Sequence, residues 1–455
     1  MEENQSQSLR FYTRKRKKNM TDLTTTSDKI SALPESLLHL ILSFLDIKQV
    51  VQTSCLSTKW RYIWRFVPVL NFDYYSLKKE SEKGKRLHRK ECMDIVDRIL
   101  FLHDSSIQKL KLSRFCGYYP SRIDTWLLFV VKQQVKEVKL QIKHIFEDYH
   151  QLPHLLFTSV IEVFEVKTPA SRYSVQLPNS MCSATQLRIL KLENVLLPKG
   201  NSDGELVVSC SCLEEMFLTH CSHHDLKILN ICAPQLKNLV IYSCHADSCE
   251  IKICTPNLRS LKLIFSFYKD YFLESLSSLV TANIEVSELF TKFLLTVLNG
   301  LRNVKNLTIS GYRHKTLPRC AELDQGLYTL SNLSCLEIIG FLPGVRDVTS
   351  LLKRSPYIET LIFACCCIEG KEEDLGEDRS TKYVFSHLKY VRVRKFYGCE
   401  NEVKLLEFLL KTAPGLQTIT ITLTRAFLKS EKFNEFSMKL HSLPRASSSV
   451  TILFS

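Results

Sequence analysis

The hydrophobic pattern near the start of the chain is densest in LPESLLHLILSFL, from Leu33 to Leu45. Pro34 at the first helical position marks the start of a helix. At about 100° per residue, its apolar side chains cover an arc of roughly 200°, about twice the stripe that one core needs. Two short helices are expected to follow, one near Lys48–Ser54 and one beginning around Ser57. Because the apolar arc of the first helix is wider than one core needs, its second apolar flank needs a partner surface of its own.

From Ile107 onward the chain repeats the pattern apolar-x-x-apolar-x-apolar. The thirteen hexamers begin at Ile107, Val135, Ile161, Leu187, Leu213, Leu236, Leu258, Leu279, Val304, Leu333, Ile358, Leu388 and Leu416, and the copy at Leu279 is the weakest. Their mean spacing is about 26 residues, which is typical of leucine-rich repeats. The alternation inside each hexamer predicts a short strand with one buried face.

Helical signals lie between these strands. One segment has Ser287 as its N-cap and ends at Asn299-Gly300, and a second spans Asn401–Gly415. Strand, helix and parallel strand in succession form a right-handed coil. The sequence therefore predicts an α/β fold, in which a small three-helix module precedes a curved, right-handed leucine-rich-repeat solenoid with its strands on the concave wall.

Some of the 17 cysteines fit this repeat. The position eight residues after a repeat start, where leucine-rich repeats favour Asn or Cys, holds either Cys or Phe in six copies. These residues are Cys221, Cys244, Cys366, Phe115, Phe341 and Phe396. Small, weakly polar thiols can fill the turn below a strand, so we interpret these cysteines as packing residues.

Composition and charge limit the possible partners of the chain and its cellular location. The 45% hydrophobic and 24% charged residues are typical of a folded protein. The net charge of +14 suits an acidic partner but also fits many proteins with no nucleic-acid role, so nucleic-acid binding is the lesser hypothesis. Neither an apolar leader nor a membrane-length apolar run is present, which predicts reduced thiols in the nucleus and/or cytoplasm and no membrane partner. Basic Arg14–Lys18 is either an import signal or part of a solvated tail.

Residues for catalysis or metal binding are not evident. The chain has no glycine-rich phosphate loop, no G-x-S-x-G motif and no HExxH pair. The stretch HCSHH, His220–His224, lacks a second ligand pair and is interpreted as a solvated turn. The cysteines of Ala364–Cys367 overlap a repeat, and a vicinal redox pair is their second interpretation. We expect no cofactor, no metal and no catalytic residue.

The N-terminal segment Asp28–Asp73 resembles the F-box of plant F-box/leucine-rich-repeat proteins. The matching marks are LP at Leu33-Pro34, ILSFL at Ile41–Leu45, TSCLS at Thr53–Ser57, and the tryptophans Trp60 and Trp64. Two positions depart from the usual form: Lys59 stands where Arg is commoner, and Asp46 where Pro often lies. Neither change removes an apolar contact.

The C-terminal end resembles a second module of that family, the FBD domain. The similarity covers Phe385–Ile421 and a closing segment Leu443–Phe454, with the glutamate and glycine marks at Glu402 and Gly398, although basic Arg392 fills a slot that is often acidic. The predicted organisation is a disordered basic tail at 1–27, an F-box at 28–75, a charged loop or linker at 76–91, leucine-rich repeats at 92–384 and an FBD domain at 385–455.

This resemblance implies the substrate receptor of a Skp/cullin/F-box ubiquitin ligase, a non-catalytic subunit. The F-box would dock on a Skp-type adaptor, and through it on cullin, while the repeats hold an unknown protein substrate. The expected adaptor-binding residues are Leu33, Pro34, Leu37, Ile41, Leu42, Leu45, Leu56, Trp60 and Trp64. About half of them should instead hold the module together, and sequence alone does not assign the two roles. The alternative is a leucine-rich-repeat interaction scaffold that acts outside a ubiquitin ligase.

Overall fold

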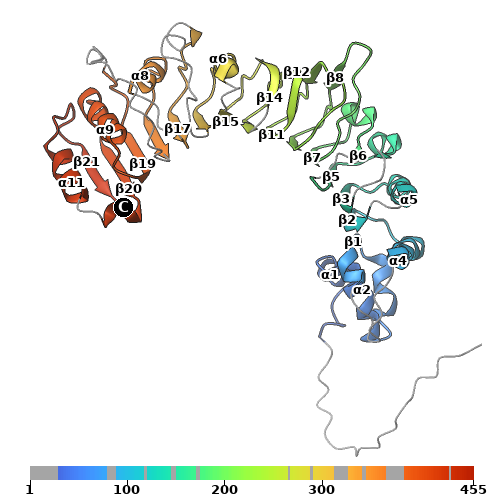
Figure 1. Cartoon of the computed structure of the whole chain (residues 1–455). Coiled ribbons are helices and arrows are strands. Elements are labelled where there is room, and N and C mark those ends of the chain that lie inside the picture. Colours follow the sequence, from blue (N-terminus) through green and yellow to red (C-terminus); the bar gives the residue numbers. More distant parts are fainter. Residues whose placement is uncertain are drawn as a thin grey trace, which may run out of the picture.

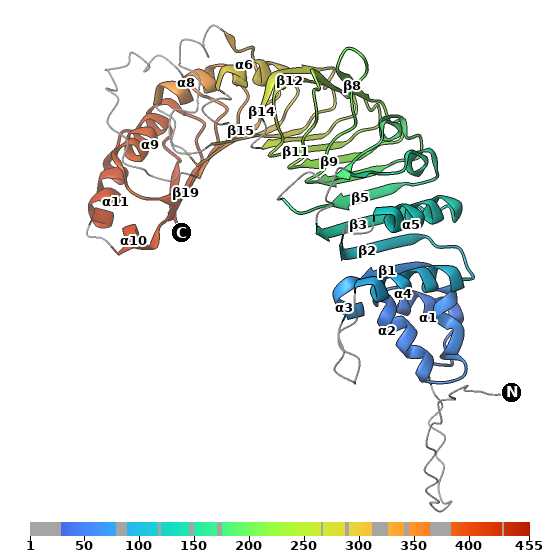
Figure 2. The ribbon, with the colours of Figure 1, turned by 45° about the vertical axis from the view of Figure 1, so that its right-hand side comes forward.

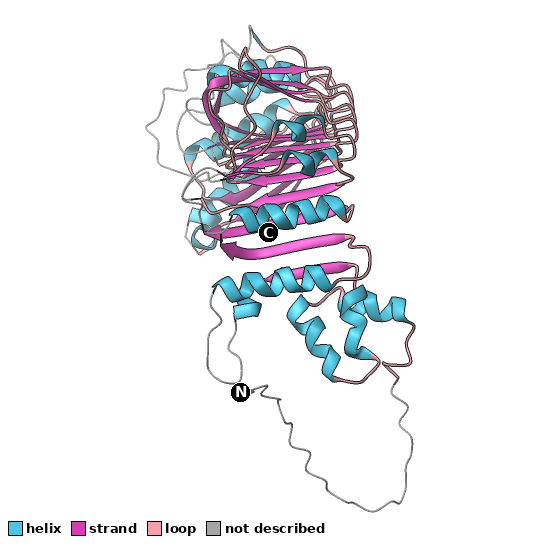
Figure 3. Ribbon diagram, turned by 90° about the vertical axis from the view of Figure 1, so that its right-hand side faces the viewer, coloured by secondary structure: helices cyan, strands magenta, loops and turns pink. Residues whose placement is uncertain are grey.

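The computed structural model describes residues 29–78, 89–116, 120–144, 150–170, 175–264, 267–286, 291–311, 326–340, 345–364, 384–429 and 432–455. The predicted tail at 1–27 lies outside these residues. The rest is a small helical module followed by a long arc, with strands on its inner wall and helices mainly on its outer side (Figure 1 and Figure 2). Viewed from the side, the strands stack like rungs above the helical module (Figure 3). This architecture confirms the predicted fold class.

The helical module contains α1 (Glu35–Leu42), α2 (Ile47–Gln52) and two 3₁₀ segments, η1 (Thr53–Cys55) and η2 (Trp60–Phe66). Pro34 is the N-cap of α1, one position before its expected place. Asp46 caps α2 by accepting a hydrogen bond from the backbone N–H of Gln49, and the Gln49 side chain accepts one from the N–H of Asp46. The third predicted helix is present as η2, in the tighter 3₁₀ form.

One parallel sheet of fifteen strands runs the length of the arc. Its strands, in order, are β1 (Val69–Asp73), β2 (Lys109–Cys116), β3 (Glu137–His144), β5 (Val163–Lys167), β7 (Ile189–Glu193), β9 (Glu215–Thr219), β11 (Asn238–Tyr242), β13 (Ser260–Ile264), β15 (Thr281–Val286), β16 (Asn306–Gly311), β17 (Cys335–Ile339), β18 (Thr360–Ala364), β19 (Tyr390–Phe396), β20 (Thr418–Leu423) and β21 (Thr451–Phe454). Every predicted hexamer holds a strand that begins two residues after the hexamer start. β1 and β21, which the repeat did not include, lie at the two ends of the sheet.

The type of secondary structure on the outer side of the solenoid changes along the arc. It carries α4 (Arg89–Leu102), α5 (Pro120–Lys132), η3 (His154–Thr158) and η4 (Asn179–Ser183), and later α6 (Thr291–Gly300), α8 (Val345–Lys353), α9 (Glu400–Thr412), α10 (Arg425–Leu428) and α11 (Lys432–Ser442). Between these groups lies a second parallel sheet of β8 (Glu205–Val208), β10 (Ile228–Ile231), β12 (His245–Cys254) and β14 (Phe267–Glu274). A further small sheet pairs β4 (His150–Gln151) with β6 (Val175–Gln176). No described helix combines the length and apolar character needed to cross a bilayer.

The parallel sheet extends into the segment predicted as the F-box. β1, inside the predicted F-box, pairs with β2, so the sheet begins at Val69 and not after residue 92. The ends of the expected linker are helical: Ser76 lies in α3 (Tyr74–Lys78), and α4 begins at Arg89. Residues 79–88 lie outside the described part. Buried Leu77 and Met93 explain why these ends fold, because each anchors its helix on the core despite the charged neighbours.

The cysteine positions of the repeat are packing positions where the structure describes them. Cys221 and Cys244 are both 2% exposed, and their Sγ atoms lie 3.6 Å from the backbone oxygens of Leu192 and Leu218. Phe115 and Phe396 fill the same position in other repeats and are buried as well. Cys366 and Phe341 lie outside the described residues, as do the cysteines that follow Ala364. In the part of the chain that is described, including His220–His224, no three His, Cys, Asp or Glu side chains gather as a metal site would require.

Alkylation by iodoacetamide at pH 8 should therefore distinguish exposed cysteines from buried ones. Burial raises the pKa of Cys182 to about 12 and of Cys210 to about 11, which removes the reactive thiolate. Cys55 and Cys212 are exposed. Mass spectrometry over time should show Cys55 and Cys212 modified in the folded chain, with Cys182 and Cys210 modified only after denaturation. Rapid modification of the second pair in the folded chain would contradict this packing.

Glu402 closes the turn that leads into α9. Its buried carboxylate accepts hydrogen bonds from the backbone N–H groups of Tyr397, Gly398 and Cys399, at 3.0, 2.8 and 3.1 Å. Gly398 has φ +79°, and a Cβ there would lie 2.0 Å from the Phe427 ring. The glutamate and glycine that resemble the FBD marks therefore have a structural role in this turn.

Replacing Glu402 with alanine should destabilise this end of the solenoid. The change removes the acceptor of three partly buried backbone N–H groups, which costs about 1–3 kcal/mol for each group that finds no water. Exposed Glu400, which pairs with Lys404 on the same helix, is the matched control and should leave stability nearly unchanged when it becomes alanine. Thermal unfolding and hydrogen exchange over α9 measure both. Equal effects of the two substitutions would show that Glu402 does not hold the turn.

Candidate functional site: an exposed apolar face on the first helix

Helix α1 carries two separate apolar stripes. Leu38 and Leu42 are 0% and 1% exposed and belong to the core, whereas Leu37, Leu40 and Ile41 are 45%, 55% and 47% exposed. At about 100° per residue, the exposed three span an arc of roughly 100° beside the buried stripe. The broad apolar arc of the sequence is therefore divided in the structure, and one half faces solvent.

Exposed apolar side chains also occur beyond α1. Phe44, in the turn that ends the helix, is 81% exposed, and Leu56, after η1, is 67% exposed. Other exposed large apolar side chains of this module are Ile30, Tyr62 and Phe66. Single exposed apolar residues are ordinary on a protein surface, but a row of them on one short helix is typical of a binding surface.

The structure separates the nine residues expected at this site. Pro34, Leu37, Ile41 and Leu56 are exposed. Leu33, Leu45 and Trp64 are partly buried against the core. Leu42 and Trp60 are buried in the interior of the module. Leu40 and Phe44 were within the apolar arc and could have been chosen from it, whereas Ile30, Tyr62 and Phe66 carry no local signal of exposure.

Trp60 holds the start of α1 in place. Its indole Nε1 donates a hydrogen bond to the Ser31 hydroxyl at 2.8 Å, and the neighbouring Lys59 ammonium donates to the Ser31 carbonyl. These contacts fix the residues that precede Pro34, and hence the direction in which α1 leaves the turn. Trp60 thus supports the exposed face from behind.

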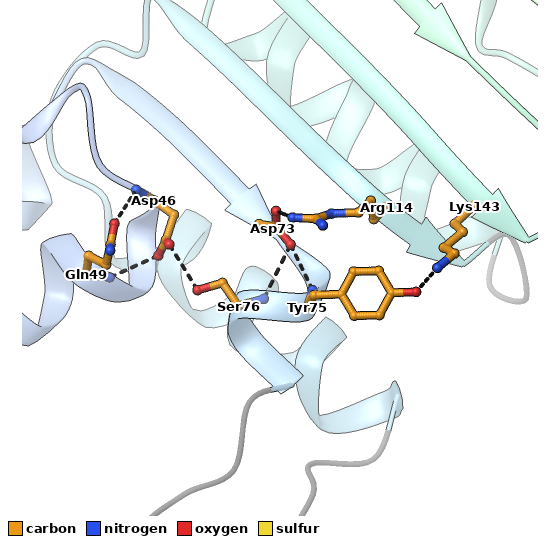
Figure 4. A network of polar contacts seen from close by, with 7 residues as sticks. All are labelled: Asp46, Gln49, Asp73, Tyr75, Ser76, Arg114 and Lys143. Atoms are coloured by element: carbon orange, nitrogen blue, oxygen red, sulfur yellow. Dashed lines mark hydrogen bonds and ion pairs between the residues drawn. The ribbon is translucent and has the colours of Figure 1, made fainter.

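A network of polar contacts joins this module to the solenoid (Figure 4). The Ser76 hydroxyl donates to the second carboxylate oxygen of Asp46 at 3.0 Å. Asp73 accepts from the backbone N–H groups of Tyr75 and Ser76, at 2.8 and 3.3 Å, and forms an ion pair with Arg114 on β2. The Lys143 ammonium on β3 contacts the Tyr75 hydroxyl. Asp46, which departs from the usual proline, therefore links α2 to the first strands of the sheet.

Comparison with protein families assigns both parts of this chain. The F-box domain model matches residues 30–72, which include the exposed face of α1. A second model, the leucine-rich-repeat domain of At1g61320/AtMIF1, matches residues 99–451 and so covers most of the chain. This chain belongs to the plant F-box/leucine-rich-repeat family. It is an F-box protein with a repeat domain suited to protein interaction.

Relatives of this F-box/leucine-rich-repeat chain match most of its length at low identity. The F-box/FBD/LRR-repeat protein At5g56420 of Arabidopsis thaliana is 26% identical over 94% of this chain and 99% of its own length. The F-box/FBD/LRR-repeat protein At3g26920 of the same plant is 27% identical over 97% and 100%. The putative F-box protein At3g58860 is 28% identical over 87% and 88%. The FBD assignment of residues 385–455 stays a prediction, because the repeat model runs through most of that region.

Proposed function

We propose that this chain is the substrate-recognition subunit of a Skp/cullin/F-box ubiquitin ligase. The observation that carries the proposal is the second apolar stripe of α1, formed by Leu37, Leu40 and Ile41 with Phe44 beside it, which the chain leaves in solvent. Stable interfaces bury about 1,200–2,000 Å² around an apolar or aromatic centre. The stripe supplies such a centre within the residues that match the F-box model.

The adaptor would bind this stripe, with Leu56 and Pro34 as additional exposed contacts. Leu33, Leu45 and Trp64 would contribute only through their exposed edges, and Leu42 and Trp60 would support the face from inside. The repeats would hold the target on the concave wall. The chain would then act without catalysis, since bringing two proteins together raises the effective concentration of one at the other.

The junction between the module and the sheet supports this role. Ser76 and Asp73 connect Asp46 of the module to Arg114 of the solenoid, so the two parts are held in a defined orientation. A bridge with a fixed orientation presents a bound target repeatedly at the same place. A flexible linker would instead spread it over many positions.

Co-expression of the intact chain with a Skp-type adaptor and a cullin tests the proposal. The three proteins should co-elute in size-exclusion chromatography, and the level of a bound target should fall in a ubiquitin-dependent way. Failure of the wild-type chain to bind the adaptor would end the proposal. A stable complex that excludes cullin, with no ubiquitin-dependent loss of any partner, would favour a scaffold outside the ligase.

A further inference from the structure

The outward-facing side chains of the concave wall differ between its two ends. Near the module several are charged and form ion pairs: Lys109 with Glu137 at 2.9 Å, and Lys139 with Glu165 at 3.2 Å. From β16 to β21 many of the outward positions instead carry threonine: Thr308, Thr360, Thr418, Thr420, Thr422 and Thr451. The far end of the arc therefore has its own surface chemistry.

Two arginines on β19 dominate the charge of this end. Arg394 pairs with Glu337 on β17 at 2.6 Å, across the intervening strand β18. Arg392, two residues earlier on the same face, is exposed and has no ion pair among the residues that the structure describes. Glu337 is the one carboxylate at the described outward-facing strand positions from β16 to β21. One arginine charge is therefore left uncompensated.

Apolar side chains flank this free charge. The sheet register places Ile362 on one side of Arg392 and Thr420 on the other, with Leu453 one strand beyond Thr420. Leu453 is 49% exposed, and Tyr390, on the same face of β19, is 45% exposed. Neighbouring strands lie about 4.8 Å apart, so Arg392 and Leu453 are separated by roughly 10 Å across the sheet. We call Tyr390, Arg392, Thr420 and Leu453 the C-terminal patch.

We propose that the C-terminal patch binds a target segment that carries an aspartate or glutamate opposite Arg392 and an apolar side chain opposite Leu453. An exposed guanidinium without a carboxylate partner favours bidentate pairing with such a group. The Thr420 hydroxyl lies beside it as a further hydrogen-bonding group, and Tyr390 and Leu453 provide apolar contact on two sides. This inference rests on the proposed function, because it assigns a chemistry to the target that the repeats would hold.

Selection from a displayed library of random twelve-residue peptides on the purified full chain tests this patch. Peptides that bind the wild-type chain should be enriched in Asp or Glu at one position, with an apolar residue near it. Arg392→Gln should weaken a selected synthetic peptide at least tenfold, and Arg392→Glu should shift the selection toward Lys or Arg. Lys111→Gln is the matched control, since Lys111 faces outward on β2 at the other end of the wall, and should change binding less than twofold.

Several outcomes would overturn the inference. They are the absence of acidic enrichment, unchanged peptide affinity in Arg392→Gln, or binding that requires phosphoserine where aspartate and glutamate fail. Adaptor binding by the same protein samples separates the two proposals. A chain that binds the adaptor but selects no acidic peptide refutes the patch alone. A chain that selects acidic peptides through Arg392 but binds no adaptor refutes the ligase role and leaves the patch as a peptide-binding surface.

Discussion

Replacing Leu37 and Ile41 together with glutamate is expected to abolish adaptor binding and to leave the fold intact. Both side chains are about half exposed, and glutamate is a good helix former, so α1 should persist. In a complex, two unpaired carboxylates would face an apolar surface. A hot-spot side chain is worth about 2 kcal/mol or more, so the double change should weaken binding by roughly 100-fold or more. Isothermal titration calorimetry with the purified adaptor measures the loss.

Two controls separate loss of the docking face from a general surface effect and from unfolding. Leu128 on α5 has a similar exposed fraction, 43%, and Leu128→Glu should bind the adaptor like the wild type. Leu42→Asp, in contrast, places a charge in the core and should unfold the module, so its loss of binding would be uninformative. Binding by the double variant within about threefold of wild type, at unchanged melting temperature, would rule out this face as the docking site.

Phe72→Ala should destabilise the helical module and the first repeats together. Phe72 is fully buried on β1 and is the last residue that the F-box model matches, and β1 also pairs with β2. Truncation of a buried phenylalanine costs about 3–5 kcal/mol. Because a solenoid is stabilised mainly between neighbouring units, the effect should be local. Hydrogen exchange should therefore rise in α2 and β2 but remain unchanged in β19 and β20.

Tyr62→Ala is the matched aromatic control for this prediction, since Tyr62 belongs to the same module and is 56% exposed. It should leave hydrogen exchange unchanged in both parts. If Phe72→Ala increased exchange in α2 while β2 kept its protection, the module and the solenoid would be independent units. The fixed junction on which the proposed bridge depends would then be wrong.

The repeat architecture was predictable because its periodicity follows directly from stacking. Each unit must place the same apolar positions inside, so every hexamer marks a strand, even the weak copy at Leu279. The outer side was less predictable. The three shortest repeats, which start at Leu213, Leu236 and Leu258, have too little chain for a full helix and form β10, β12 and β14 there. Nothing in the local pattern separates such a strand from a loop.

The candidate site was predictable as a stripe but not residue by residue. Helical periodicity showed that α1 has more apolar surface than one core can cover, and this led to Leu37 and Ile41. It gave no means to see that Leu42 and Trp60 face inward, because that depends on how η2 packs across α1. For the same reason, exposed Tyr62 and Phe66 could not be recognised from their positions. The role of Asp46 at the junction likewise depends on Ser76, thirty residues away in the sequence.

Hydroxyl-radical footprinting of the intact chain, free and with a Skp-type adaptor, tests the central claim most directly. It reports the solvent exposure of individual side chains, so it compares the stripe on α1 with other apolar residues in one experiment. We predict that Leu37, Leu40, Ile41 and Phe44 lose most of their reactivity when the adaptor is bound, while exposed Leu128 and Leu453 keep theirs. Unchanged oxidation of the α1 residues in a saturated complex would contradict the account.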